Sequence, residues 1–285
     1  MIFNKQVHHF DKANLKKLFK PAGTSNGEDN GQVTIIGGSS LFHGAPILPL
    51  IVASRIVDMV FFATPEKSVG MVAQNLKSKL MSFIWIPWED KEEYIKKSDA
   101  ILIGPGFMRF GSEKTPNGKR HIECDEECQK TKEITKALLT KFPNKKWVID
   151  AGSLQTMDPD WIPSNAILTP NKKEYQILFG KMDPEVAAKK YNCIIVIKGP
   201  TTLVYSKEEI IEVHGGNPGL TKGGTGDVQA GLTAALLAKN DPLLSACAGA
   251  FIVKAAADEL QKEKGVYYNA DDLANKIPQT LSSLI

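Results

Sequence analysis

The residues best suited to chemistry lie in a glycine-rich segment, 215–227, which reads GGNPGLTKGGTGD and leads into the apolar run VQAGLTAALLAK. Glycines let the backbone turn sharply and present successive N–H groups to an anion. A helix that begins directly afterwards adds the positive end of its dipole. The pattern therefore predicts a cradle for a phosphoryl group, formed by Gly223, Gly224, Thr225 and Gly226.

Asp227 stands at the start of the predicted helix and is the candidate catalytic residue. We expect the helix dipole to keep its carboxylate ionised at neutral pH. The carboxylate can then accept a proton from a substrate hydroxyl beside the bound phosphate. The purely structural alternative is that Asp227 is a helix N-cap, but a cap does not require the glycine run that precedes it.

Two widespread nucleotide-binding motifs are absent. The Walker pattern G-x-x-x-x-G-K-[ST] does not occur around Lys222. The run Gly104-Pro105-Gly106 does not open a dinucleotide fingerprint, because Arg109 stands where the third glycine belongs. A Rossmann enzyme that transfers a hydride is therefore disfavoured.

Short apolar runs alternate with helical stretches from Val33 onward. The predicted buried strands are 33–36, 59–63, 83–86, 100–103, 147–149, 166–168 and 194–197, with a hairpin of 203–205 and 210–213. The predicted helices are 45–57, 69–80, 226–238, 243–262 and about 270–277. Continuous apolar strands separated by helices predict an α/β fold with a mostly parallel sheet covered on both faces. The strands end in glycines and polar residues, which we expect to converge on one crevice at their carboxyl ends.

Composition narrows the class of protein. The chain has 285 residues, 42% of them hydrophobic and 24% charged, which is an ordinary globular balance. We expect one domain over 1–285, with 1–30 as an N-terminal extension and 107–123 as a surface insertion. The net charge of +3 argues against a nucleic-acid partner. The sequence contains neither an apolar membrane span nor the apolar core of a signal peptide, so we predict no membrane partner and a cytoplasmic location.

The cysteines, Cys124, Cys128, Cys193 and Cys247, are sparse and form no extracellular framework, which predicts a reducing compartment. His121, Cys124 and Cys128 could offer three metal ligands, but no fourth lies nearby, so ordinary side chains are favoured and no metal site is predicted. Cys193 and Cys247 lie in apolar runs and are predicted to be core residues.

A series of motifs in order along the chain resembles the NAD(P)H-hydrate dehydratase family, a branch of the ribokinase-like superfamily. The motifs are Gly37-Gly38-Ser39, Phe42-His43-Gly44-Ala45-Pro46, Gly104-Pro105-Gly106, Asp150-Ala151-Gly152, Leu168-Thr169-Pro170-Asn171 with Glu174, Lys198-Gly199, and Asn217-Pro218-Gly219 followed by Gly223 to Asp227. Phe42 replaces a tyrosine that is common in the family. The resemblance covers about Val33 to Leu260, and it implies a ribokinase-like, three-layer α/β/α fold.

The resemblance also implies an activity. In the family, an adenine nucleotide phosphorylates the hydroxyl on C6 of a hydrated nicotinamide ring, the phosphate leaves, and the 5,6 double bond is restored. ADP is the donor in bacterial and archaeal members and ATP in eukaryotic ones, and Mg²⁺ accompanies the nucleotide. Asn171 stands where many bacterial members have histidine, and the asparagine form is familiar from ATP-using members, so both donors stay open. The family's epimerase activity resides in a separate domain, which we do not expect within these residues.

The site residues implied by the resemblance fall into two groups. The substrate contacts map onto Ala45, Gly106, Asn171 and Asp227. The nucleotide contacts map onto Lys198, Gly199, Pro200, Thr201, Thr202, Gly223, Gly224, Thr225 and Gly226. The expected partners are NAD(P)H hydrate and an adenine nucleotide, and family members usually form homo-oligomers.

Two other functions remain as alternatives. One is a kinase of the same fold for a small alcohol of the hydroxyethylthiazole, hydroxymethylpyrimidine, pyridoxal or sugar type. Gly44-Ala45-Pro46 and Asn217-Pro218-Gly219 favour the dehydratase over that kinase. The other is a nucleotide sensor without turnover, which would not need Asp227 as a base.

Overall fold

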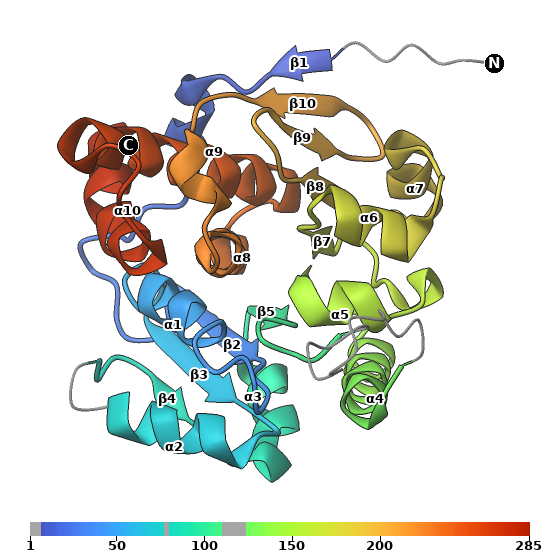
Figure 1. Ribbon diagram of the computed structural model, residues 1–285. Coiled ribbons are helices and arrows are strands. Elements are labelled where there is room, and N and C mark those ends of the chain that lie inside the picture. Colours follow the sequence, from blue (N-terminus) through green and yellow to red (C-terminus); the bar gives the residue numbers. More distant parts are fainter. Residues whose placement is uncertain (1–6, 77–79, 110–123) are drawn as a thin grey trace.

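The computed structural model describes residues 7–76, 80–109 and 124–285. Its strands join one sheet in the order β1-β10-β9-β8-β7-β6-β5-β2-β3-β4 (Figure 1). Their bounds are β1 Val7–His9, β2 Gln32–Ile36, β3 Met59–Ala63, β4 Ile84–Trp85, β5 Ala100–Ile103, β6 Lys146–Ile149, β7 Ile167–Leu168, β8 Ile194–Ile197, β9 Thr202–Tyr205 and β10 Ile210–Val213. Neighbouring strands from β4 to β8 are parallel, and only the pairs β8–β9 and β9–β10 are antiparallel in the described sheet. The predicted mostly parallel sheet is confirmed.

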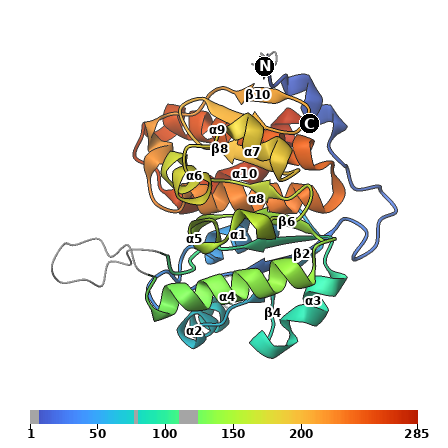
Figure 2. The same cartoon turned by 90° about the vertical axis from the view of Figure 1, so that its right-hand side faces the viewer.

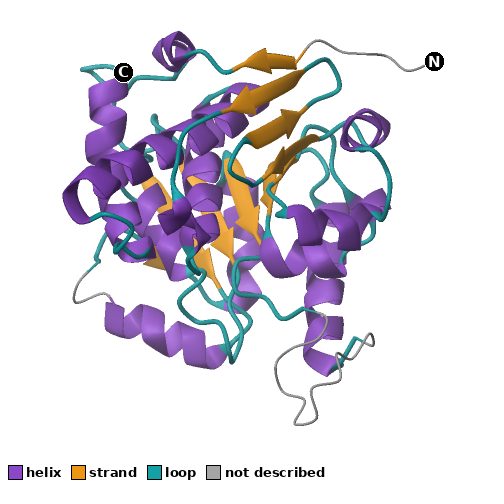
Figure 3. Ribbon diagram, turned by 45° about the horizontal axis from the view of Figure 1, so that its top comes forward, coloured by secondary structure: helices purple, strands orange, loops and turns teal. Residues whose placement is uncertain are grey.

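Helices cover both faces of the sheet (Figure 3). One face carries α1 Ile47–Ala53, α8 Thr225–Lys239 and α9 Pro242–Lys264, with α10 Ala270–Leu284 packed outside them. The other face carries α3 Lys91–Lys97, α4 Glu126–Lys141, α5 Ala151–Thr156, α6 Lys172–Phe179 and α7 Pro184–Lys190, while α2 Lys67–Leu76 lies beside β4. Figure 2 shows α4 and α8 on opposite sides of β6. The arrangement is three layers, α/β/α.

The strands are apolar at successive positions because both of their faces are buried. In β5, Ile101 and Ile103 point into the core beneath α3 to α7, whereas Leu102 points into the core beneath α8. All three side chains are fully buried. The apolar runs that predicted these strands therefore arise because helices cover both faces of the sheet.

The N-terminal extension does more than the sequence indicated. Val7–His9 form β1, which pairs in parallel with β10 at the edge of the sheet. The following 3₁₀ helix, Lys12–Lys17, buries Leu15, and Leu18 is buried directly after it. Both leucines pack in the cluster formed by α8, α9 and α10. The first 30 residues are thus partly integrated into the fold.

Two predicted helices have different bounds in the structure. The helix predicted over 45–57 is shorter, because it begins at Ile47 after Pro46 and ends at Ala53. The helix predicted over about 270–277 is longer and continues through Pro278 to Leu284. A proline removes one backbone hydrogen bond from a helix interior, but the buried side chains of Leu273 and Ile277 hold α10 against its neighbours.

The predicted surface insertion, 107–123, is only partly described. Residues 107–109 belong to the described chain, and Phe107 and Met108 are buried rather than at the surface. Phe107 packs into the core beneath α3 to α7. The start of the predicted insertion is therefore a core segment, and 110–123 lie outside the described residues.

A disulfide joins Cys124 to Cys128, which the sequence reading did not anticipate. The two residues flank the start of α4, where Asp125 caps the helix by accepting a hydrogen bond from the backbone N–H of Cys128. Bonded sulfurs are not thiolate ligands, so the metal alternative for this pair is excluded, and His121 lies outside the described residues. Cys193 and Cys247 are free and buried, as predicted. Among the described helices, none has the length and apolar character needed to cross a membrane.

Candidate active site

The carboxyl ends of the central strands meet, as the sequence predicts. The backbone N–H of Gly38, after β2, donates to the carbonyl of Pro105, after β5, at 2.9 Å. The N–H of Asp150, after β6, donates to the carbonyl of Ile103 at 3.0 Å. The N–H of Lys198, after β8, donates to the carbonyl of Pro170 at 3.0 Å. These bonds tie the loops into one rim at the edge of the sheet.

The turn Gly104-Pro105-Gly106 brings two predicted substrate contacts close together. Gly106 has a φ of +75°, and a Cβ there would lie 2.9 Å from Cδ of Pro46 and 2.5 Å from the Phe42 carbonyl oxygen. The loop that carries Ala45 therefore lies directly against Gly106. Only glycine fits this position, since both the backbone angle and the space exclude a side chain.

A cavity of about 620 Å³ opens beside this rim. That volume is within the usual range for a small-molecule or cofactor site. The predicted site residues that line it are Asn171, Lys198, Gly199, Pro200, Thr202, Thr225 and Gly226. The predicted residues Ala45, Gly106, Thr201, Gly223, Gly224 and Asp227 are not part of its lining. The cavity thus gathers most of the predicted nucleotide contacts and one substrate contact.

The glycine-rich loop forms the expected start of α8. Gly224 is the N-cap, in the left-handed region at φ 90°, and Asp227 is the third residue of the helix. The alternative in which Asp227 is the N-cap is therefore wrong. The hydroxyl of Thr225 donates to the carbonyls of Leu220 and Lys222, at 2.7 and 2.9 Å, and holds the loop closed. The Thr225 N–H donates to the carbonyl of Lys222 at 3.4 Å, whereas the Gly226 N–H has no carbonyl partner within the helix and is available to an anion.

We expect Gly224→Ala to disrupt this cradle. A Cβ at Gly224 would lie 2.6 Å from Cδ1 of Leu48 and 2.9 Å from Cβ of Ala270, and the left-handed backbone itself costs an L-residue about 1–2 kcal/mol. The expected result is a lower midpoint in urea unfolding and weaker binding of ADP, measured by calorimetry. The matched control is Gly223→Ala, because nothing lies within 4 Å of a Cβ there. An equal fall of the urea midpoint in the two variants would contradict the predicted clash at Gly224.

Lys198 connects the sheet to the start of α8. Its Nζ lies 3.0 Å from Oδ1 of Asp150, which also accepts a hydrogen bond from the Thr169 hydroxyl at 2.8 Å. The same Nζ would lie 3.2 Å from a Cβ built on Gly226. Burial alone would lower the pKa of Lys198, but Asp150, Glu174 and Asp227 hold it above its ordinary value. A lysine cation is therefore fixed at the end of the cavity nearest the cradle.

Asn171 and Glu174 form a capping box at the start of α6. Oδ1 of Asn171 accepts from the backbone N–H groups of Lys173 and Glu174, and the Glu174 carboxylate accepts from the Asn171 N–H at 2.8 Å and from Nε2 of Gln155 at 3.1 Å. Burial raises the pKa of Glu174, whereas Lys198 opposes the rise. The Nδ2 amide of Asn171 donates to no described protein group and remains free for a ligand in the cavity.

The expectation that Asp227 stays fully ionised at neutral pH is wrong. Burial, followed by the negative charge of Asp150, raises its pKa to about 7, although Lys198 acts in the opposite direction. Glu174 adds a further negative charge that raises it. A group with a pKa near neutrality accepts and releases protons readily at the pH where most enzymes work. The environment of Asp227 is therefore well suited to a general base.

The Asn217-Pro218-Gly219 motif joins several segments at the cavity wall through hydrogen bonds and close packing. Nδ2 of Asn217 donates to the carbonyl of Ala257 at 2.8 Å, and its Oδ1 accepts from the Gly219 N–H and the Tyr268 hydroxyl. Gly219 itself packs so closely on Tyr268 that a Cβ would lie 2.4 Å from the ring. The motif therefore shapes the wall next to the predicted nucleotide contacts.

Sequence reasoning missed two polar residues that helices α8 and α9 contribute to the cavity. Lys254, nine-tenths or more buried in α9, donates to the carbonyls of Gly199, Pro200 and Gly215 at 3.1, 2.7 and 2.9 Å and so joins two loops of the wall. Gln229 lines the cavity, and its buried Nε2 has no hydrogen-bond partner among the described residues. Each interrupts an apolar stretch of its helix, and that is the signal by which they could have been found.

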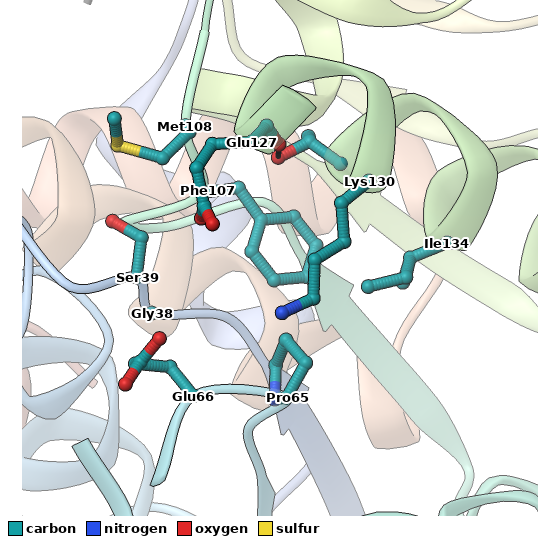
Figure 4. Close-up of a pocket in the computed structure, with 10 residues that line it drawn as sticks. Gly38, Ser39, Pro65, Glu66, Phe107, Met108, Glu127, Lys130 and Ile134 are labelled. Carbon is teal, nitrogen blue, oxygen red and sulfur yellow. Dashed lines mark hydrogen bonds between the residues drawn. The ribbon is translucent and has the colours of Figure 1, made fainter. Parts of the chain in front are cut away.

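A second, much smaller hollow of about 10 Å³ lies at the ends of β2, β3 and β5 (Figure 4). Gly38, Ser39, Phe107 and Met108 line it, and Lys130 and Glu66 approach it from opposite sides. It has room for about one water molecule. Phe107 directly follows Gly106, so the hollow lies on the side of the crevice where Ala45 and Gly106 meet.

Comparison with solved structures defines the class of fold. A ribokinase-like superfamily protein from Enterococcus faecalis V583 superposes with a TM-score of 0.78 at 21% identity, over 98% of this chain and 96% of that one. An ADP/ATP-dependent NAD(P)H-hydrate dehydratase from Bacillus subtilis, co-crystallised with ATP and Mg²⁺, superposes with a TM-score of 0.77 at 20% identity, over 99% and 100%. The protein has the ribokinase-like α/β fold, as predicted.

Sequence comparison then defines the family. A family model described as NAD(P)H-hydrate dehydratase matches residues 33–279, so the chain belongs to this family. A bifunctional NAD(P)H-hydrate repair enzyme Nnr from Methanocaldococcus jannaschii is 36% identical over 275 residues, which are 94% of this chain and 51% of that protein. An ADP-dependent (S)-NAD(P)H-hydrate dehydratase from Nitrosopumilus maritimus is 30% identical over 292 residues, 92% of this chain and 93% of that protein. The chain thus spans about half the length of the bifunctional relatives.

Proposed function

We propose that the protein is an adenine-nucleotide-dependent dehydratase that returns the hydrate of NADH or NADPH to the intact cofactor. The observation that carries the proposal is the position of Asp227. Its carboxyl group, with a pKa of about 7, stands at the start of α8, where Lys198 and the glycine cradle meet the end of the large cavity. Membership of the NAD(P)H-hydrate dehydratase family supports the choice of substrate.

The proposed reaction has two steps, a phosphoryl transfer and an elimination of phosphate. The C6 hydroxyl of the hydrate attacks the terminal phosphorus of the nucleotide, Asp227 takes the hydroxyl proton, and the shortened nucleotide leaves with the electrons of the broken P–O bond. The C6–O bond then breaks, phosphate leaves with that electron pair, and the lone pair of the ring nitrogen supplies electrons in its place. The departing phosphate takes a proton from C5, and the electrons of that C–H bond restore the 5,6 double bond. With ADP the products are NAD(P)H, AMP and phosphate.

The protein orients the two ligands and stabilises the charge that develops in the transition state. We propose that the nucleotide occupies the large cavity, against Lys198, Gly199, Pro200, Thr201 and Thr202, and that Gln229 donates to it. The amides of Gly223, Gly224, Thr225 and Gly226 face the phosphoryl group. Preorganised donors of this kind stabilise charge that develops in the transition state. The hydrate lies on the side of Ala45 and Gly106, with Asn171 between the two ligands.

The charges at the end of the cavity fit the Mg²⁺ that would accompany the nucleotide. Asp150, Glu174 and Asp227 are three carboxyl groups around one ammonium group, that of Lys198, so acidic groups outnumber basic ones here. Mg²⁺ typically takes one or two carboxylates together with waters and phosphate oxygens. We propose that Asp150 and Glu174 would hold the ion beside the phosphates, where it would neutralise part of their charge.

Product analysis tests the proposed function. The protein is incubated with hydrated NADH and either ADP or ATP, and the near-ultraviolet absorbance of the reduced nicotinamide is followed. The expected result is recovery of that absorbance together with equal amounts of phosphate and shortened nucleotide. Accumulation of a stable phosphorylated alcohol would instead support the kinase alternative. The two donors are compared in the same assay, and the ADP-dependent relative favours ADP.

We expect kcat/KM to rise with pH through about 7. Asp227 acts only when it is deprotonated, and burial raises its pKa to about 7. Below that pH most of the enzyme carries the protonated form, so kcat/KM should fall about tenfold for each further unit of pH, and it should level off above it. The measurement is a pH profile at subsaturating substrate. An inflection near pH 4, the ordinary range of an aspartate, would argue against Asp227 as the base.

We also propose that the protein forms a single domain, assembles as a homo-oligomer and is located in the cytoplasm. The single sheet that includes β1 supports the first of them. Light scattering coupled to gel filtration measures the oligomeric state directly. A monomer at working concentrations would contradict the second prediction without affecting the proposed chemistry.

A further inference from the structure

Two histidines and a glutamate meet at the outer edge of the sheet, where β1 and β10 lie side by side (Figure 1). His9 in β1 pairs directly with Glu212 in β10. His214 follows Glu212 by two residues and so points to the same face of the sheet. Nδ1 of His9 lies 2.9 Å from Nε2 of His214, and an Oε2 of Glu212 lies 3.4 and 3.0 Å from these two nitrogens.

Hydrogen bonds alone do not account well for the close approach of these three atoms. If Nε2 of His214 carries a proton, it must share that proton between His9 and Glu212. If Nδ1 of His9 carries it and donates to His214, the lone pairs of His214 and Glu212 face each other at 3.0 Å with no proton between them. A single cation at the centre of the triangle would satisfy all three lone pairs at once.

The triangle has the size of a metal coordination shell. Two ligand atoms about 2.0–2.1 Å from Zn²⁺ lie about 3.3 Å apart at a tetrahedral angle, and the three separations here are 2.9, 3.0 and 3.4 Å. In the described part of the chain, these are the side chains that bring three such ligand atoms within 4.8 Å of one another. We propose that His9, Glu212 and His214 bind a divalent transition metal ion, for which two imidazoles and a carboxylate favour Zn²⁺. The fourth position is open to water, because His9 and His214 are exposed.

The site joins the N-terminal segment to the wall of the large cavity. His9 precedes the segment that buries Leu15 and Leu18, and it lies outside the residues that match the family model. His214 directly precedes Gly215, whose carbonyl is held by Lys254 at the cavity wall. A bound ion would therefore fasten an edge strand of three residues, β1, to a loop that borders the proposed nucleotide site.

Titration of the full chain with ZnCl₂ tests the proposal. Isothermal calorimetry on wild-type protein, stripped beforehand with a chelator, is expected to show one Zn²⁺ per chain. His9→Ala and His214→Ala should weaken binding at least as much as loss of an outer-shell partner does, about 10–100-fold. The matched control is His8→Ala, which removes an exposed histidine from the opposite face of the same strand. Zn²⁺ should also raise the unfolding temperature of wild type and His8→Ala, but not that of His9→Ala.

Co²⁺ absorption identifies the ligands independently of affinity. Co²⁺ bound to imidazole and carboxylate gives visible bands without the intense near-ultraviolet band of a thiolate ligand. The proposal is overturned if the triple variant His9→Ala/Glu212→Gln/His214→Ala binds Zn²⁺ as wild type does. It is equally overturned if His8→Ala loses as much affinity as His9→Ala, or if a thiolate band appears. None of these readouts depends on dehydratase activity.

Discussion

Asp227→Asn is expected to lower kcat by about 10²–10⁴-fold, the usual loss when a general base is removed. The amide has nearly the shape of the carboxyl group but cannot take a proton from the C6 hydroxyl. Nucleotide affinity should stay the same or increase slightly, because a negative charge beside the phosphates disappears. The measurements are the rate of NADH recovery at saturating substrate and the dissociation constant of ADP from calorimetry.

The control for this substitution is Asp271→Asn, which removes an exposed carboxylate from the first turn of α10. It has the same chemistry at the start of another helix and should leave kcat unchanged. Loss of the pH limb near 7 in Asp227→Asn would link that limb to Asp227 directly. Turnover near the wild-type rate in Asp227→Asn would show that another group takes the proton, and the proposed mechanism would then be wrong.

Much of the fold could be predicted because a parallel strand that is buried on both faces has apolar residues at successive positions. The bounds of strands β2 to β10 lie within a residue of those predicted, although Thr34 interrupts the apolar run of β2 and Glu212 that of β10. The helices α3, α4 and α7 are less visible, since each buries only one stripe and is otherwise polar. The edge strand β1 could not be predicted, because its three residues are exposed and its pairing depends on a partner some 200 residues away along the chain.

In the candidate site too, features formed by contiguous residues could be predicted, whereas features that depend on residues far apart in the chain could not. The glycine cradle and Asp227 are contiguous in sequence, so their pattern predicts an anion site at a helix start. The ionisation state of Asp227 is predicted wrongly because its pKa depends first on burial of the carboxyl group and then on Asp150, after β6, and Glu174, in α6. The role of Lys254 likewise arises only when three carbonyls from two loops converge on it. Electrostatics of this kind requires the three-dimensional arrangement.

Lys198→Met is expected to destabilise the protein by about 3–5 kcal/mol, the usual cost of removing one partner from a buried ion pair. The Asp150 side chain is 3% exposed and that of Lys198 is 20% exposed, so water cannot replace the lost ammonium group around the carboxylate. Urea unfolding should show a lower midpoint with an unchanged slope. The control is Lys141→Met, which removes the lysine from an exposed pair with Glu92. Its cost should be below about 1 kcal/mol.

The double variant Lys198→Met/Asp150→Asn separates stability from nucleotide binding. A neutral amide at position 150 can still accept the hydrogen bond from the Thr169 hydroxyl, and it leaves no unpaired charge at that position. The double variant should therefore recover much of the stability lost in Lys198→Met. Its affinity for ADP, measured without Mg²⁺ because Asp150 is a proposed ligand of that ion, should stay low, since the ammonium group beside Gly226 is still missing. If ADP binds the double variant as tightly as wild type, Lys198 serves only to neutralise Asp150 and does not contact the phosphates.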